Sequence, residues 1–183
     1  MQLFHVSDRP IDPGQALRRY GLATDKSDVL APAFRMLDGD SLARSMLLTR
    51  TGRLRRRFRS DPDMQLVLIE ALFERTRVQV APDLPSRLTS VFLWPTVELA
   101  RDFRERYRPR GLIHRCLLTE GLALSRDASL VAARVDLAAV IDDEIQTIER
   151  RAVRYWTTDG AIDYPEILVQ GTVVVAAILA PNT

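Results

Sequence analysis

The sequence predicts an α+β fold in a single domain, and three observations lead to this prediction. A chain of 183 residues has the size of one domain. Apolar segments typical of strands lie at the start, middle and end of the chain, with amphipathic helical segments between them. These segments do not alternate as regular β-α-β units, which argues against a parallel α/β fold.

The first half of the chain is expected to contain one strand, a short helix over Gly14–Gly21 and two longer helices. Residues 2–6 (QLFHV) have the composition of a short strand. Asp38–Asp40 can cap a helix over about 41–50. Ser60–Asp63 is a stronger cap with Pro62 in the first turn, and it predicts a helix to about Arg75. The apolar positions of this second helix fall on one face: Leu66, Ile69, Leu72 and Phe73.

The middle of the chain is expected to form a strand, a helix and a second strand. Residues 88–94 are apolar and end at Pro95, which predicts a strand. Thr96 can cap a helix over 97–107, and a β-rich run follows over 111–118.

The last part of the chain predicts a long helix followed by two strands. Residues 135–156 repeat apolar side chains at helical spacing. Residues 166–169 (EILV) and 172–179 (TVVVAAIL) are both strand-like, and Gln170-Gly171 separates them.

Composition limits the class of protein. With 46% hydrophobic and 27% charged residues the chain is ordinary for a soluble globular protein. It has no apolar run of the ~18 residues that a membrane span needs, and Met1–Pro10 does not resemble a signal peptide. The lone Cys116 excludes an internal disulfide and a multi-cysteine zinc site. We therefore expect a cytoplasmic protein, or an effector exported without a conventional signal peptide, with no membrane partner and no metal.

The charges are nearly balanced, with 26 Lys and Arg against 24 Asp and Glu, but one basic run stands out. The run can be a solvated loop, or it can contact the phosphates of a cofactor or a nucleic acid. It has no acidic residue and contains Arg50, Arg53, Arg55, Arg56, Arg57 and Arg59.

Three short segments carry candidate functional residues. The first, Phe4–Ser7, has His5 near the end of a strand, where a histidine is more often structural. The second, Ser90–Trp94, is an apolar strand followed by a helix that carries Ala100 and Phe103.

The third segment is Tyr164–Val173, in which Glu166 enters a strand of Ile, Leu and Val. A buried carboxylate costs several kcal/mol unless it is paired or hydrogen-bonded. Glu166 therefore has either a specific role or a place at the solvent end of the strand.

Together and in this order, the three segments resemble the ADP-ribosyltransferases of the diphtheria-toxin and poly(ADP-ribose) polymerase type. That family carries a His, an aromatic residue and a Glu on three strands of a split antiparallel sheet. The resemblance implies this sheet with flanking helices in one domain over 1–183, and a helical insertion at about 26–80. Pro85–Arg87 also resembles a small, uncharacterised bacterial branch with this layout.

The resemblance implies catalytic roles for Glu166 and His5. Glu166 would stabilise an oxocarbenium-like transition state as the nicotinamide–ribose bond of NAD breaks. His5 would bond a ribose hydroxyl, the backbone of Val6 would hold the nicotinamide amide, and Ser7 would assist. If so, His5, Phe92 and Glu166 should line one pocket.

The remaining cofactor-binding residues follow from the same resemblance. Phe92 stands where the family usually has Tyr, so it keeps the flat ring face but lacks the hydroxyl. Trp94 and Phe103 could also hold the nicotinamide ring. Arg9 or Arg87 could bind the pyrophosphate through two hydrogen bonds.

The predicted function is NAD-dependent ADP-ribosyl transfer, a glycosyltransferase reaction, to an unidentified protein or nucleic-acid acceptor, or NAD hydrolysis. Asp163 precedes Glu166 by three positions, so the Glu-x-Glu pair of arginine-modifying toxins is absent. One alternative is an inactive module of the same fold that binds nucleic acid or a protein through the Arg-rich insertion. Another is an RNA 2′-phosphotransferase, against which Glu166 argues because that family has a His in its place.

Overall fold

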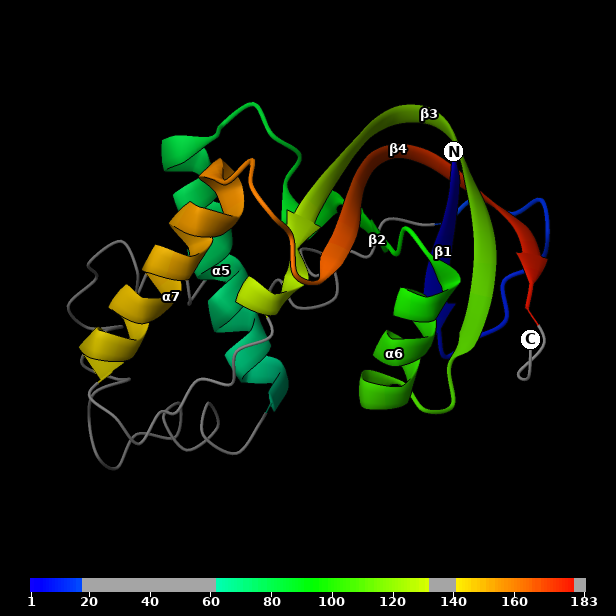
Figure 1. Ribbon diagram of the computed structural model, residues 1–183, viewed down its shortest axis with the longest axis horizontal. Helices are drawn as coiled ribbons and strands as arrows, with labels where there is room; N and C mark the ends of the chain where they lie inside the picture. Colours follow the sequence, from blue (N-terminus) through cyan, green and yellow to red (C-terminus); the bar gives the residue numbers. More distant parts are fainter. Residues whose placement is uncertain (18–61, 132–140, 180–183) are drawn as a thin grey trace. The chain divides into compact units, whose positions relative to one another are not determined.

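The computed structural model describes residues 1–17, 62–131 and 141–179 (Figure 1). These residues form a four-stranded antiparallel sheet and three α-helices, which confirms the predicted α+β class. Internal contacts divide the chain into two compact units. The sheet unit comprises residues 1–20, 85–128 and 161–183, and the helical unit comprises residues 21–84 and 129–160.

The sheet unit contains the strands in the spatial order β1-β3-β4-β2. Every neighbouring pair is antiparallel. The strands span Gln2–Ser7 (β1), Val91–Leu93 (β2), Leu112–Asp127 (β3) and Pro165–Ile178 (β4). The two long strands, β3 and β4, run side by side through a pronounced curve (Figure 1).

A pair of glycines lets β3 and β4 approach closely within this curve. Gly121 lies opposite Gly171, and Gly121 has a positive φ of 109°. A Cβ added at Gly171 would lie 2.0 Å from the carbonyl oxygen of Glu120. The prediction of two strands separated at Gln170-Gly171 was therefore wrong, because Gly171 pairs with Gly121 and β4 continues through it.

The sheet curls back on itself. Phe4 and Trp94 exchange two backbone hydrogen bonds with N–O distances of 2.9 and 2.7 Å, which joins β1 to the residue after β2. Residues 14–17 pair with β4 on the same edge as β2, where Leu17 N donates to the carbonyl oxygen of Val173 over 2.8 Å. The short helix predicted over 14–21 was therefore wrong at 14–17, because the backbone there bonds to β4. One sheet face therefore encloses an apolar core that includes Leu3, Val91, Leu93, Cys116, Ile167 and Val169.

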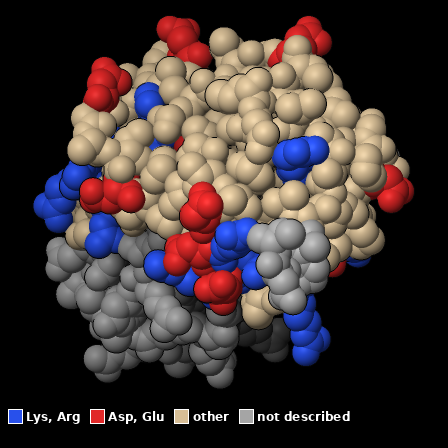
Figure 2. All heavy atoms as spheres, turned by 45° about the vertical axis from the view of Figure 1, so that its right-hand side comes forward, with Lys and Arg blue, Asp and Glu red and all other residues tan. Residues whose placement is uncertain are grey.

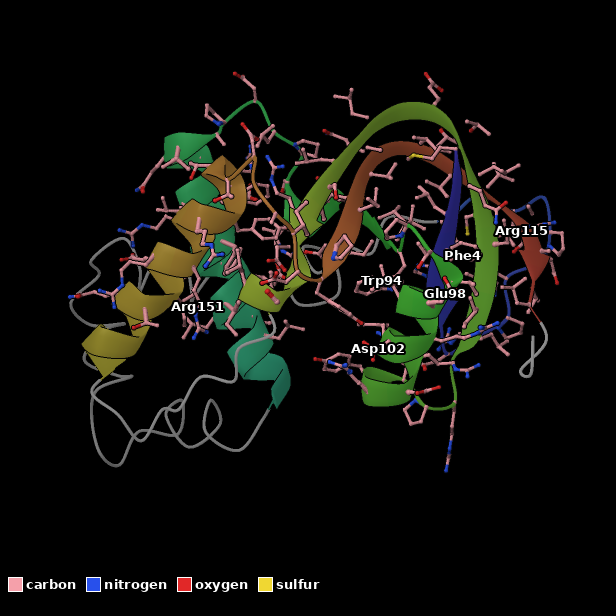
Figure 3. The ribbon with its side chains drawn as sticks, in the orientation of Figure 1. Phe4, Trp94, Glu98, Asp102, Arg115 and Arg151 are labelled. Atoms are coloured by element: carbon pink, nitrogen blue, oxygen red, sulfur yellow. The ribbon has the colours of Figure 1, made fainter. Side chains whose placement is uncertain are left out.

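The other apolar cluster of the sheet unit packs around α6 (Val97–Tyr107). This helix begins where the sequence predicted, because the Thr96 hydroxyl accepts a hydrogen bond from Leu99 N over 3.3 Å. The cluster includes Phe4, Val6, Trp94, Ala100 and Ile113. In Figure 3, Phe4 and Trp94 lie beside this helix.

The helical unit contains α5 (Pro62–Val80) and α7 (Ile141–Thr157). The indole nitrogen of Trp156 donates to the carbonyl oxygen of Phe73 over 2.8 Å, which joins the two helices. Residues 67–73 are all buried, so α5 has no solvent face there, whereas Leu66, predicted to be in its apolar stripe, is exposed.

Two of the sequence predictions concern residues outside the described ranges. The helix predicted over 41–50 and the Arg50–Arg59 run lie outside the described residues. α5, from the predicted insertion, shares its unit with α7, and the single-domain organisation stays a prediction. None of the helices in the described ranges combines the length and apolar character needed to cross a membrane.

Candidate functional site

Glu166 is buried near the start of β4 and forms an ion pair with Arg87. Arg87 begins a 3₁₀ turn (Arg87–Thr89), which is fixed by the Ser86 hydroxyl accepting from Leu88 N over 3.2 Å. The two charged side chains are only 5% and 7% exposed. A guanidinium partner explains how a carboxylate is tolerated in a strand of Ile, Leu and Val.

Phe92 on β2 completes this group. The guanidinium carbon of Arg87 lies 4.8 Å from the centroid of the Phe92 ring, within the range of a cation–π contact. Phe92 lies opposite Leu168 in the register, and Glu166 is two residues from Leu168, so Phe92 and Glu166 share one sheet face. We call Arg87, Phe92 and Glu166 the Arg87 cluster.

His5 reaches the Arg87 cluster through the backbone. Its Nδ1 lies 3.1 Å from the carbonyl oxygen of Phe92, and since a carbonyl only accepts, Nδ1 carries the proton. Alternation along β1 puts His5 on the face of Leu3, whereas the Phe92 ring lies on the face opposite Leu93. The structure thus brings His5 to the main chain of Phe92, and brings Phe92 and Glu166 together by their side chains.

A second histidine accompanies His5 on the enclosed face. The rings of His5 and His114 are 6.3 Å apart, and Nε2 of the fully buried His114 accepts a hydrogen bond from Ile11 N over 3.2 Å. His114 Nδ1 has no hydrogen-bond partner among the described residues. Burial lowers the pKa of both histidines, and the hydrogen bond to Phe92 opposes this shift at His5. Both rings are therefore neutral at pH 7.

The neighbouring Cys116 is not poised as a nucleophile. Its thiol is buried and lies 3.5 Å from the carbonyl oxygen of His114. Burial raises the pKa of Cys116 to about 12, so the thiol stays protonated at neutral pH.

Three residues with predicted roles in NAD binding belong to the apolar cluster around α6. Val6 and Trp94 are buried in it, and Phe103 packs against it. The Trp94 and Phe103 ring centroids are 4.8 Å apart, so each ring covers part of the other. These residues are grouped with α6 and not with the Arg87 cluster.

Ser7 and Arg9 lie where β1 leaves the sheet. The Ser7 hydroxyl accepts from Arg9 N over 3.2 Å, and Arg9 is exposed. Asp8, which lies between Ser7 and Arg9, forms an ion pair with Arg108 at the end of α6. In Figure 2 acidic and basic side chains are interspersed on the visible face of the described residues.

The sequence offered Arg87 as one of two candidates for binding the pyrophosphate, with Arg9, but its pairing with Glu166 was not predicted. The signal that could have found it is chemical: a carboxylate inside an apolar strand needs a cation, and Arg87 directly precedes the strand of Phe92. No group of three or more His, Cys, Asp or Glu side chains suited to a metal ion occurs in the described part of the chain.

Comparison with known protein families gives a match over most of the described sheet and helices. Residues 58–181, about two thirds of the chain, match the family described as "Protein of unknown function (DUF2441)". The matched region includes Arg87, Phe92 and Glu166 but begins after β1, so His5 lies outside it. No curated protein matches the chain. The chain belongs to the DUF2441 family of proteins of unknown function.

Proposed function

We propose that the protein catalyses NAD-dependent ADP-ribosyl transfer to an unidentified macromolecular acceptor, or NAD hydrolysis. The Arg87 cluster is the observation that carries this proposal. It combines an aromatic ring, a guanidinium and a carboxylate at one place between β2 and β4. These three groups suit three parts of NAD: the nicotinamide ring, the diphosphate and the ribose attached to the ring.

Glu166 is the catalytic carboxylate in this proposal. As the bond between ribose and nicotinamide breaks, nicotinamide takes the bonding electron pair and leaves as a neutral molecule. The ribosyl carbon then develops positive charge, and water or the acceptor adds to it with loss of a proton. A fixed carboxylate in a poorly solvated place stabilises such a charge more than water does.

Arg87 and Phe92 bind the substrate in this proposal. Arg87 contacts both Glu166 and the Phe92 ring, so NAD binding requires the guanidinium to move from them to the diphosphate. Arginine suits this because its planar fork matches phosphate as well as carboxylate. The departure of Arg87 exposes the Phe92 ring to the nicotinamide.

His5 is a positioning residue in this proposal, because its observed contact is with the backbone of Phe92. By donating from Nδ1 it fixes β2 relative to β1, and so holds the Phe92 ring in place. A direct contact between His5 and a ribose hydroxyl stays a prediction from the resemblance.

The decisive experiment is nicotinamide release from NAD by the wild-type chain and by Glu166→Gln, with and without cell lysate as a source of acceptor. We expect the variant to lose about 10²–10³-fold in rate, equivalent to roughly 3–4 kcal/mol. NAD affinity, measured by calorimetry, should change much less, because ground-state NAD lacks the charge that Glu166 stabilises.

Glu120→Gln is the matched control, since Glu120 is exposed on β3 and should leave the rate unchanged. Melting curves of both variants show whether a lower rate reflects unfolding. A folded wild-type chain that neither binds NAD nor releases nicotinamide contradicts the proposal.

A second candidate is an inactive module of this fold that binds nucleic acid or a protein partner. The ion pair itself favours it, because Arg87 neutralises the carboxylate that the reaction needs. A nucleic-acid module would bind single-stranded DNA or RNA with an affinity that falls steeply with salt, and it would not bind NAD.

A further inference from the structure

We infer that Arg87 makes the site selective for substrates that carry a diphosphate, because it holds Glu166 until an anionic group replaces the carboxylate as its partner. This inference rests on the proposed function. It concerns which substrates can reach Glu166, and it makes Arg87 a specificity-determining residue.

In the structure Glu166 is held in its ion pair with Arg87. Its carboxylate accepts a hydrogen bond from Arg87 Nη1, and both side chains are almost completely buried. A carboxylate paired with a guanidinium at such close range presents little net negative charge to a neighbouring ribose. Glu166 is therefore a weak stabiliser of a ribosyl cation while the pair persists.

Separating Arg87 from Glu166 costs free energy unless the guanidinium gains another anionic partner. Separating a buried ion pair leaves each buried charge without the other, which is strongly unfavourable. A substrate without an anionic group offers nothing to the guanidinium that it displaces. A diphosphate replaces the carboxylate with another bidentate anion, so the guanidinium keeps a partner and Glu166 becomes available.

The same guanidinium also covers the ring of Phe92. Arg87 lies over Phe92, at 4.8 Å from its centroid, as well as against Glu166. One movement of one side chain therefore releases both the carboxylate and the ring face. NAD carries a group for each of the three residues, whereas nicotinamide riboside carries the same ring and the same scissile bond without the diphosphate.

The experiment compares NAD with nicotinamide riboside as substrates for nicotinamide release. In both cases the bond from the ribosyl carbon to the ring nitrogen breaks, nicotinamide keeps the electron pair, and water adds with release of one proton. For the wild-type chain we expect kcat/KM for NAD to exceed that for the riboside by about 100-fold or more.

The Arg87→Gln variant should narrow this preference to less than about 10-fold, since it lowers kcat/KM for NAD and raises it for the riboside. Arg87→Lys keeps the charge and should keep most of the preference. Arg106→Gln is the matched control, because Arg106 is an exposed arginine paired with Asp102 on α6, and its variant should leave the ratio unchanged.

A further experiment tests the role of Arg87 in the wild-type chain alone. Inorganic pyrophosphate should occupy Arg87 in the wild-type chain, and should therefore stimulate nicotinamide release from the riboside while it competes with NAD. If Arg87→Gln does not fold, this experiment decides whether Arg87 makes the site selective for a diphosphate.

The outcomes separate the two proposals. A wild-type chain that cleaves NAD but prefers it by less than 10-fold overturns the role of Arg87 and leaves the proposed function intact. So does a riboside activity that pyrophosphate does not stimulate. A wild-type chain that neither binds nor cleaves NAD overturns the proposed function itself.

Discussion

Gly121 and Gly171 face each other across β3 and β4 so closely that neither position has room for a side chain. A Cβ at Gly121 would lie 2.3 Å from the carbonyl oxygen of Gln170, and one at Gly171 would lie 2.0 Å from that of Glu120. The obstacle is backbone in both cases, so it cannot rotate away. The close pairing of the two long strands depends on both glycines.

Gly121→Ala and Gly171→Ala should each destabilise the protein by about 1–3 kcal/mol, because the strands must separate to admit the methyl group. Gly121→Ala carries the added cost of a positive φ. Urea unfolding curves measure the effect. Gly160→Ala is the control, since its nearest atom would be the Thr158 methyl carbon at 3.4 Å, and a loss as large in that variant would contradict the explanation.

The Arg87–Glu166 pair predicts strongly non-additive effects on stability. Arg87→Met or Glu166→Leu alone leaves one buried charge without this partner and should cost about 3–5 kcal/mol. The double variant should cost clearly less than the sum, because neither charge remains. Denaturant unfolding of the four proteins gives the coupling free energy, and additive costs would show that the pair is not energetically linked.

His5, which is half-buried, and the buried His114 predict a loss of stability at acid pH. Burial lowers the pKa of His5 and of His114 below the value of 6.5 expected when unfolded. Between the folded and unfolded pKa values the unfolded chain binds more protons, so the free energy of unfolding falls as pH drops below 6.5. Above that pH neither ring contributes to the slope.

Each histidine adds a slope of at most about 1.4 kcal/mol per pH unit in this window. Unfolding experiments from pH 7.5 to 5 measure it. His114→Gln keeps a side-chain acceptor for Ile11 N but does not titrate, so its curve should be flatter than that of the wild type. An unchanged slope would mean that His114 does not take up a proton on unfolding.

The parts of the fold that local chemistry determines could be predicted from the sequence. The start of α6 at Thr96 and the start of α5 at Pro62 both follow from residues within one helical turn. β3 was predicted to be shorter, ending at Leu118. Glu120 and Gly121, which are of types depleted in strands, stay in it because their partners Thr172 and Gly171 on β4 continue the ladder.

The candidate site could be predicted only in part, because its contacts join distant segments. Burial of Glu166 near the start of a strand was one of two interpretations of its apolar neighbours. Its partner Arg87 lies 79 positions earlier in the chain, and no periodicity links the two. The faces of His5 and Phe92 depend on the register between β1 and β2, which a single pair at Phe4 and Trp94 sets.

The curled sheet has a consequence for how the chain folds during synthesis. β1 is synthesised before the other three strands, but its partner β3 follows more than a hundred residues later, and β3 completes its pairing only once β4 has been made. The sheet unit thus has a high contact order, and its sheet stays incomplete until β4 is available. α5 and α7 are both synthesised before β4, so the helical unit can fold cotranslationally while the sheet is still incomplete.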